Sequence, residues 1–573
     1  MRMTRRSIAC LLAFLLLGFM VVPSMAVAPS YPVDLVMVTR IRQEGLGRNS
    51  QVMQTLSELT DRLGARVTGS PNLKHADEWT KEQFEKMGLA NAHLEAYPFG
   101  RGWEMHGSAV RMIAPDQTVL WALPKAWTPG TNGAVRGKVV KVAITSMADL
   151  DKYKGKLGGA IVLLGDMRQV PLPTDPAAQR YDDKALQDIA EFSVGGGARR
   201  AGPQMDRNAM RQRMELMRAL QKFFADEKIL ATIEPSRSGD GGLVFVDSGG
   251  RYEKDQPQFP YPALVMSIEH YGRIARLLDR NVPVELELNV DTQFNDDDLN
   301  AYNSVAEIPG TDKKDEIVML GGHLDSWHGS TGATDDAAGV AACMEAMRIL
   351  KALGVQPRRT IRIALWSGEE EGLLGSRAYA KEHLAARPEP PPTPAGADAL
   401  PSYMRQPQGP LMLKPEWGKV SAYFNIDNGG GRLRGIYLQE NAMMAPIFTA
   451  WGEPFRDLGF NTITMRTTGG TDHLSFDAVG VPGFQFIQDP MDYFTRTHHS
   501  NQDAFERIQP GDMMQMSVIL ASFVYNAAMA DEMLPRKPLA AADMPPKTAE
   551  QAPAKAPASV AKPAKKAKKA SGQ

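Results

Sequence analysis

The sequence contains almost no cysteine. Of its 573 residues, only Cys10 and Cys343 are cysteines. Cys10 lies in a segment that we expect to be removed, so Cys343 would remain as a single thiol and an intrachain disulfide is excluded. Cys343 lies in an apolar helical pattern and is expected to be a small buried residue.

Long hydrophobic runs are also scarce. The run near the N-terminus, Ile8–Val22, has 15 residues, whereas a membrane-spanning helix needs about 20. Three arginines precede this run and Ser24-Met25-Ala26 follows it, which is the pattern of a signal peptide over residues 1–26. We therefore expect a secreted or periplasmic protein without a stable membrane span. An uncleaved membrane anchor is the alternative.

An excess of charge of either sign is missing. The 65 lysines and arginines nearly balance the 66 aspartates and glutamates, which gives a formal net charge of -1. A general basic surface that would attract nucleic acid is therefore not expected. With 43% hydrophobic and 23% charged residues, the composition is that of a globular protein, and the length indicates two domains.

Apolar runs and turn signals divide the chain into segments. Residues 27–124 carry helical patterns and a strand-like piece, and residues 291–535 repeat strand, loop and helix, which is typical of an α/β sheet covered by helices. Residues 125–290 are β-rich, with one short strand expected at 242–246, and are interpreted as an insertion into that domain. Residues 536–573, rich in Ala, Pro and Lys, are expected to be disordered.

Histidines and acids follow the ends of several expected strands. His323 follows an apolar strand, Glu369 and Glu370 follow the next, Asp427 follows a third, and a later segment contains His499. Each has an ordinary structural explanation, such as a hydrogen-bonded histidine or a glutamate that favours a helix dipole. In α/β folds, however, ligands collect at the carboxyl ends of strands, and four such groups together favour a metal site.

The ligand types indicate which metal would bind. Imidazole and carboxylate without thiolate fit zinc, with manganese or cobalt as alternatives. Two histidines and three carboxylates exceed the needs of one catalytic zinc, but they suit two ions that share a carboxylate. Asp335, at the start of a helix after the His323 loop, would be the shared group.

Five motifs in order carry a family resemblance: GGHLDSW, GATDDAAGV, WSGEEEGLLGS, NIDNGGG and HHSNQD. Together they resemble the zinc metallopeptidases of family M28, most closely the carboxypeptidase Q branch, over residues 295–535. The resemblance implies an α/β fold with a mixed central sheet covered by helices, of the phosphorylase/hydrolase-like type. The inserted β-rich segment, 125–290, is similar to the protease-associated domain of the same family.

The resemblance assigns roles to individual residues. One zinc would be bound by His323 and Asp427, the other by Glu370 and His499, and Asp335 would bridge both ions. Further roles are a general base for Glu369, support of the His323 ring for Asp325, and a cis peptide bond between Asp335 and Asp336. The run of three glutamates leaves a second register open, Glu370 with Glu371, although the following Gly-Leu-Leu-Gly-Ser favours Glu369 with Glu370.

Three further residues receive less definite roles. Many relatives have a tyrosine where this chain has His498, so His498 would donate to the oxyanion or to substrate, or else support its neighbours. Asp472 and His473, in the stretch GGTDHLSF, would border the substrate pocket or form a structural turn.

The expected function is that of an exported di-zinc exopeptidase. It would hydrolyse dipeptides or short peptides with a free terminus, through a metal-bridging hydroxide with Glu369 as general base. Aminopeptidase, carboxypeptidase and dipeptidase activity are not separated, and homodimerisation stays open. The inserted domain is expected to shape access to the site or to support assembly rather than to take part in chemistry. The alternatives are a one-zinc glutaminyl cyclase on the same fold and a non-catalytic, receptor-like ectodomain.

Overall fold

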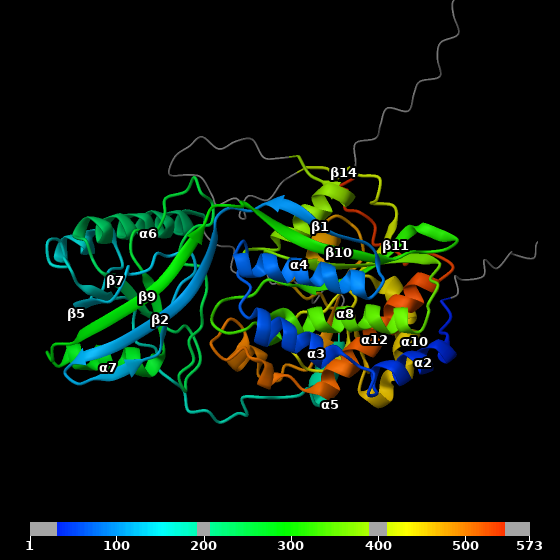
Figure 1. The fold of residues 1–573 in the computed structure, drawn as a ribbon, viewed down its shortest axis with the longest axis horizontal. Helices are drawn as coiled ribbons and strands as arrows, with labels where there is room; N and C mark the ends of the chain where they lie inside the picture. The colour runs from blue at the N-terminus through cyan, green and yellow to red at the C-terminus, as the bar shows by residue number, and fades with distance from the viewer. Residues whose placement is uncertain (1–30, 192–206, 389–408, 542, 545–573) are drawn as a thin grey trace, which may run out of the picture.

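The structure is a computed structural model that describes residues 31–191, 207–388, 409–541 and 543–544. Two eight-stranded sheets lie side by side, each with helices packed against it (Figure 1). The expected signal peptide lies outside the described residues, as does most of the expected disordered tail. Within the described part of the chain, no helix is long and apolar enough to cross a membrane.

The first sheet is mixed, as expected. Its inner strands β12, β11, β15 and β18 run parallel, while β1, β10 and β16 join by antiparallel pairing. In spatial order the strands are β1 (Ala90–Pro98), β10 (Asn300–Ile308), β12 (Arg359–Trp366), β11 (Lys313–His323), β15 (Val420–Asn425), β18 (Gly483–Gln488), β16 (Leu433–Tyr437) and β17 (Thr462–Thr464).

Helices cover both faces of this sheet. One face packs against α2 (Leu35–Gly45), α3 (Val52–Ser57), α4 (Pro71–Lys86), α8 (Ala338–Ala352), α10 (Ala445–Gly452) and α12 (Pro510–Met529). The other face packs against α9 (Leu374–Tyr379) and α11 (His473–Asp477). Nearly every side chain of α8 is buried, Cys343 among them, because a helix that is apolar all round belongs in a core. The expected burial of Cys343 is confirmed.

The second sheet combines long antiparallel strands with short parallel ones. Its order is β3 (Thr118–Leu120), β2 (Gly102–Ala114), β9 (Glu285–Asn295), β5 (Val135–Lys141), β6 (Ile161–Leu163), β7 (Ala231–Pro235), β8 (Ala263–Met266) and β4 (Ala122–Pro124). Its separate cores contain side chains of α6 (Arg207–Glu227) and α7 (Ile268–Asp279). This sheet therefore has its own hydrophobic centre, as an inserted unit requires.

The second sheet extends on both sides beyond residues 125–290, the segment that we expected to be inserted. Strand β2 pairs with β9 from Gly102, opposite Asn295, to Ala114, opposite Glu285. Residues 102–124, which we assigned to the α/β domain, therefore belong to the second sheet. The sequence misplaces this boundary because β2 continues almost directly from β1, so that only long-range pairing separates the two sheets.

The strand expected at 242–246 joins neither sheet. The chain instead forms an isolated bridge between Phe245 and Ser500, and the Val246 N–H donates to the His499 carbonyl at 2.8 Å. Gly241 and Gly242 just before it have positive φ angles of 64° and 87°, which only glycine adopts freely. The segment is thus turned out of the second sheet and docked on the first unit.

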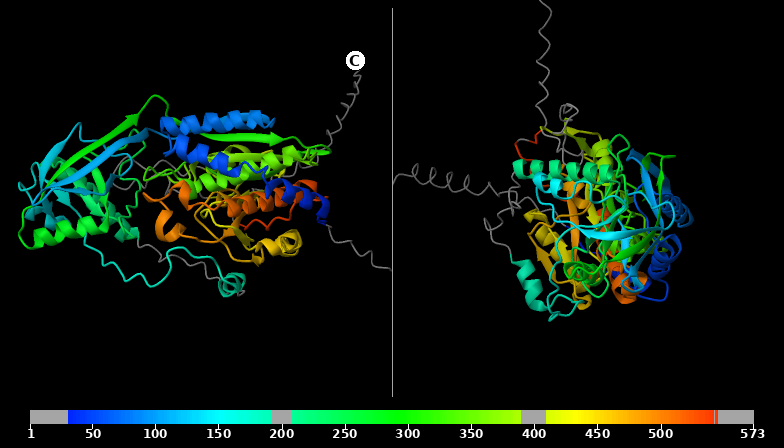
Figure 2. Two further views of the ribbon diagram at one scale, coloured as in Figure 1. Left: turned by 60° about the horizontal axis from the view of Figure 1, so that its bottom comes forward. Right: turned by 90° about the vertical axis from the view of Figure 1, so that its left-hand side faces the viewer.

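A second connection reaches back across the two units. From the second sheet, residues 165–182 lead to α5 (Asp183–Ala190), which packs beside β17 (Figure 2, left). The Arg180 guanidinium of this segment contacts Asp489 at 3.0 Å and Asp512 at 2.7 Å. Both carboxylates are buried, so this pairing joins the 165–182 segment to the first unit.

Residues 536–573 were expected to be disordered, but the start of this segment contacts the first unit. Lys537 lies 2.6 Å from Asp477, and the Arg536 guanidinium donates to the Val420 carbonyl at 2.6 Å. The described part of the tail is therefore packed against the first sheet, because these cations meet buried carbonyl and carboxylate groups there.

His328 offers a test of the contact between the two units. It is buried, with Nε2 2.7 Å from the Pro124 carbonyl and its ring 4.8 Å from that of Trp103. Burial lowers the pKa of His328 to about 4. Since an unfolded histidine has a pKa of about 6.5, the folded state favours the neutral ring. This contribution to stability is complete above pH 6.5 and is lost as the pH falls from 6.5 to 4.

We therefore expect the variant His328→Gln to lose less stability on acidification than the parent chain. The side-chain amide of glutamine can still donate a hydrogen bond to the Pro124 carbonyl, but it does not titrate. Between pH 7 and pH 4 the free energy of unfolding of the parent chain should fall by about 3 kcal/mol more than that of the variant. Urea unfolding at the two pH values measures this difference. Equal losses in the two proteins would contradict this assignment.

Candidate metal centre

Four loops bring the expected ligands together at the carboxyl ends of parallel strands. His323 is the last residue of β11, Glu370 follows β12, and Asp427 follows β15. His499 comes from the loop after β18, and Asp335 from the turn before α8. Because β12, β11 and β15 are adjacent and parallel, their ends lie at one edge of the sheet, where ligands collect in α/β folds.

Asp335 lies between two histidines. Its Oδ1 is 3.2 Å from Nε2 of His323, and its Oδ2 is 3.5 Å from Nε2 of His499. Each carboxylate oxygen thus faces a different imidazole. This is the arrangement that a bridging ligand between two ions requires.

Each histidine has a second acidic neighbour. Nε2 of His323 is 3.7 Å from Oδ1 of Asp427, and Nε2 of His499 is 2.9 Å from Oε2 of Glu370. Two groups of donors therefore share Asp335. This grouping agrees with the two ligand sets that the family resemblance implies.

The donor atoms themselves fit a metal ion. Nε2 of His323, Oδ2 of Asp335 and Oε1 of Glu370 are buried and have no hydrogen-bond partner. Buried polar atoms are almost always paired. Three buried polar atoms without a partner in one site therefore indicate that a bound group completes the site. Imidazole and carboxylate without thiolate suit zinc. These residues thus fit a divalent cation.

The electrostatics of the site point the same way. Burial, followed by the charges of nearby carboxylates such as Asp335, raises the pKa of Glu370 well above its usual value. Burial likewise raises the pKa of Glu369, to which Asp427 and Asp472 add. So many acids in one buried place oppose one another's ionisation. A bound cation would relieve that repulsion and favour the ionised ligands.

Asp325 contacts the other ring nitrogen of His323, the role that the resemblance implies, but it does so mainly through its backbone carbonyl. Nδ1 of His323 lies 3.0 Å from the Asp325 backbone carbonyl and 3.6 Å from its carboxylate. The carboxylate accepts the backbone N–H groups of Glu369 at 3.3 Å and Glu370 at 3.2 Å. Its Oδ2 also accepts the Thr68 hydroxyl at 3.1 Å. Asp325 thus orients the His323 ring through its backbone and fixes the turn of both glutamates through its side chain.

The geometry separates the three consecutive glutamates. Gly368 has a φ of 69°, and a Cβ there would lie 2.5 Å from the Tyr97 hydroxyl, so this turn requires glycine. Glu370 then reaches His499, whereas no ion pair is found for Glu371 within the described ranges. Of the two registers considered, this arrangement favours Glu369 with Glu370.

The peptide bond between Asp335 and Asp336 is cis, as the resemblance implied. The Asp336 carboxylate accepts the backbone N–H of His323 at 3.3 Å and that of Gly339 at 3.0 Å. Asp336 therefore joins the end of β11 to the start of α8. It lies close enough to His323 and Asp427 to count among potential ligand atoms, yet its oxygens are already engaged.

Sequence reasoning missed one residue that holds the bridging aspartate. The Asp503 carboxylate accepts the backbone N–H of Thr334 at 2.6 Å and that of Asp335 at 3.2 Å. Asp503 is the last residue of the motif HHSNQD. The motif could be recognised in the sequence, but no sequence pattern indicates that its last residue contacts Asp335.

His498 lies close enough to Asp335 and His499 to count among potential ligand atoms, although the resemblance gives it a different role. Its ring stacks on that of His499, with centroids 3.7 Å apart, and its Nε2 is 3.9 Å from Oδ2 of Asp335. About a third of its side chain is exposed. It is therefore open to a substrate, as the suggested donor role needs.

Asp472 and His473 are not open to a substrate cleft in this structure. Both are fully buried. The Asp472 Oδ1 accepts the Ser376 hydroxyl at 2.5 Å, and Nε2 of His473 lies 3.2 Å from the Thr468 carbonyl. Of the two roles considered, this geometry favours a structural turn, because both side chains are buried and each contacts a neighbouring segment, although Oδ2 of Asp472 and Nδ1 of His473 have no hydrogen-bond partner.

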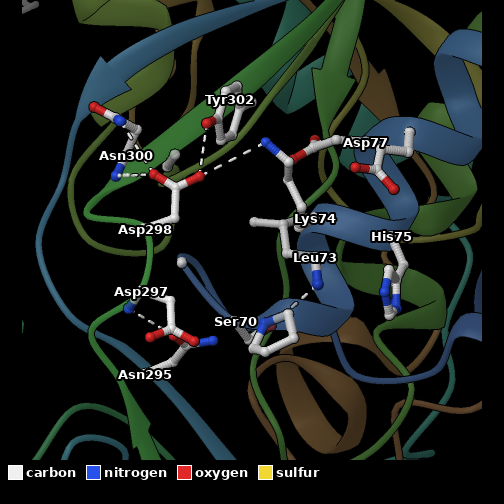
Figure 3. A pocket seen from close by; sticks show the side chains of 14 residues that line it. Ser70, Leu73, Lys74, His75, Asp77, Asn295, Asp297, Asp298, Asn300 and Tyr302 are labelled. Carbon is white, nitrogen blue, oxygen red and sulfur yellow. Dashed lines mark hydrogen bonds and ion pairs between the residues drawn. The ribbon is translucent and has the colours of Figure 1, made fainter.

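A cavity of about 210 Å³ lies elsewhere, between the N-terminal half of α4 and the connection from β9 to β10 (Figure 3). Lys74 lies over the Tyr302 ring at 3.0 Å from its centre, and Tyr302 donates to Asp298 at 2.6 Å. None of the candidate metal ligands lines this cavity. It is therefore distinct from the metal centre.

Comparison with known proteins gives consistent results. Residues 303–524 match the family model described as Peptidase family M28. Carboxypeptidase Q from Bos taurus is 25% identical over 484 residues, covering 84% of this chain and 86% of the relative. Carboxypeptidase Q from Homo sapiens is 24% identical over 485 residues, with coverage of 84% and 86%.

Solved structures share the fold. A peptidase M28 precursor from Shewanella amazonensis SB2B is 23% identical with a TM-score of 0.59, covering 88% of this chain and 99% of that one. BSAP, a zinc aminopeptidase from Bacillus subtilis, is 16% identical with a TM-score of 0.51, covering 84% and 95%. The matched residues, 303–524, contain every candidate ligand. The chain is therefore similar to peptidase family M28 over the segment that carries the candidate site.

Proposed function

We propose that this protein is an exported exopeptidase that uses two zinc ions to hydrolyse dipeptides or short peptides with a free terminus. One observation carries the proposal: the two carboxylate oxygens of Asp335 face two different histidines, each with its own acidic neighbour. A single-ion enzyme has no need for such a shared group. Relatives named carboxypeptidase Q support a peptidase with exopeptidase activity.

The chain's own groups can be assigned to steps of peptide hydrolysis. Zinc, when bound, would activate a water molecule and polarise the scissile carbonyl. His323, Asp335, Asp427, Glu370 and His499 would hold the ions. Glu369 holds no metal in this arrangement, so its carboxylate would accept a proton from the attacking water and deliver it to the leaving amine.

Two further groups would prepare the site. The Asp325 carboxylate holds the backbone on both sides of the Glu369–Glu370 peptide, which sets the direction of the general base relative to the ligand. His498, partly exposed and stacked on His499, would donate to the oxygen that gains negative charge.

The inserted unit and the location belong to the same proposal. We infer that the second sheet, residues 102–295, is a domain of the protease-associated type. The arginine-flanked apolar run and small-residue site over residues 1–26 support export.

A combined metal and substrate assay tests this function. Purified protein should contain about two zinc ions per chain by elemental analysis, and chelation should abolish turnover that zinc then restores. A panel of dipeptides with free, acetylated or amidated termini should reveal hydrolysis that depends on one free terminus. One ion with full hydrolysis would contradict the two-metal mechanism, and one ion without hydrolysis would support the cyclase alternative. Two ions without hydrolysis of any peptide would contradict a peptidase.

A further inference from the structure

The second sheet brings a cationic side chain to the metal centre. Arg237 follows β7, and its Nη2 lies 3.4 Å from Nδ1 of His499. Its guanidinium carbon is 5.7 Å from the centre of the Phe245 ring, and the residue is exposed. No ion pair is found for Arg237 within the described parts of the chain.

The loop that carries Arg237 is held in place. The preceding residue, Ser236, is buried; its N–H donates to the Met266 carbonyl at 2.8 Å, and its hydroxyl accepts the Phe245 N–H at 3.2 Å. The same loop continues into 242–246, where the Val244 N–H donates to the Asn501 side chain at 2.9 Å. Arg237 therefore occupies a defined position above the His499 loop.

Metal binding would leave the guanidinium without its present partner. Nε2 of His499 faces Glu370 and Asp335, so a metal would bind at Nε2 and the ring proton would lie on Nδ1. A protonated Nδ1 and a guanidinium are both donors and cannot hydrogen-bond to each other. Arg237 then needs an acceptor from elsewhere.

The acidic side chains of the protein near Arg237 already contact other groups. Asp247, whose charge acts on His499, lies 3.1 Å from Lys125 Nζ. The carboxylates of the metal centre are taken up by the ligand groups. Arg237 is an exposed arginine beside the candidate metal centre, with no carboxylate partner among the described residues, and its planar guanidinium can bind a carboxylate in a bidentate manner.

We propose that Arg237 binds a carboxylate of the peptide substrate, so that the inserted unit supplies a specificity-determining residue. This inference rests on the proposed peptidase function. The carboxylate is the C-terminal one or that of an acidic side chain; the chemistry is the same for both. It goes beyond the expectation that the insertion shapes access to the site or supports assembly.

The test measures binding in a chain that does not turn over. Full-length zinc-loaded protein with Glu369→Gln is titrated calorimetrically with Ala-Ala, its amide, and amidated dipeptides that carry Glu or Gln at either position. Arg237→Ala, Arg237→Lys and the control Arg280→Ala, at the exposed end of α7, are compared in this background. Zinc content is measured for each variant.

Arg237→Ala should weaken binding of carboxylate-bearing probes by about 10- to 100-fold, with Lys recovering part of the loss. Binding of probes without a carboxylate should stay unchanged, as should binding of every probe to Arg280→Ala. A loss confined to Ala-Ala identifies the C-terminus as the bound group, and a loss confined to Glu probes identifies the side chain.

Two results would overturn the proposal. One is an equal loss for charged and uncharged probes, which would mean that Arg237 only positions His499. The other is no loss for any probe. The proposed function is judged separately, by turnover of the parent chain: absence of hydrolysis would refute the peptidase, while the binding difference would still decide the role of Arg237.

Discussion

Replacing Asp335 with alanine should remove both metal ions and abolish peptide hydrolysis. Its two oxygens face His323 at 3.2 Å and His499 at 3.5 Å, so both ligand groups lose a member at once. The remaining buried acids would again oppose one another's ionisation. Zinc content should fall from about two ions per chain to near zero, as elemental analysis after dialysis would show.

A matched control separates this effect from a general loss of acidic charge. Asp297 is exposed and lines the cavity near α4, so Asp297→Ala should keep both its zinc and its activity. Circular dichroism should show that Asp335→Ala still folds. If Asp335→Ala keeps one zinc ion at full occupancy, the carboxylate does not bridge two sites.

Replacing Glu369 with glutamine should slow hydrolysis by about 10²–10⁴-fold, which is the usual worth of general acid–base catalysis. The amide keeps the size and hydrogen bonding of the side chain but does not accept the proton. Zinc content should be nearly unchanged, because Glu370 and not Glu369 lies against His499. Steady-state kinetics with the best dipeptide and elemental analysis together measure both effects.

The adjacent residue supplies the comparison. Glu370→Gln should weaken zinc binding, since its Oε2 lies 2.9 Å from His499. Loss of zinc from Glu369→Gln with retention by Glu370→Gln would reverse the two roles. Less than a tenfold loss of rate in both variants would place the chemistry elsewhere in the molecule.

The sequence was informative where chemistry and local pattern coincide. Alternating strands and helices predicted the α/β fold, and the strand ends marked His323, Glu369 and Asp427. Their meeting follows from parallel pairing of β12, β11 and β15, which places three carboxyl ends at one edge. The roles of the individual ligands came from motif resemblance and stay predictions until the variants are measured.

Contacts between distant segments could not be predicted from the sequence. The Asp503 carboxylate accepts the backbone N–H of Asp335, and the Thr68 hydroxyl donates to Asp325. No local sequence pattern predicts either pair. The segment 242–246 has strand-like residues yet docks on the His499 loop, because its glycines turn it away from the second sheet. A β-rich pattern indicates an extended chain, but it does not show which strand or loop that chain pairs with.

The docking of 242–246 makes metal affinity and the attachment of the second sheet thermodynamically linked. The amides of Val246 and Asn501 pair across this contact, with His499 and Val244 respectively, and the same His499 would hold an ion. Any event that loosens the attachment should therefore raise the zinc dissociation constant, and chelation should in turn loosen the attachment by the same free energy. Amide hydrogen exchange at Val246 and Asn501 would then accelerate on zinc removal, while exchange in α8 stayed slow.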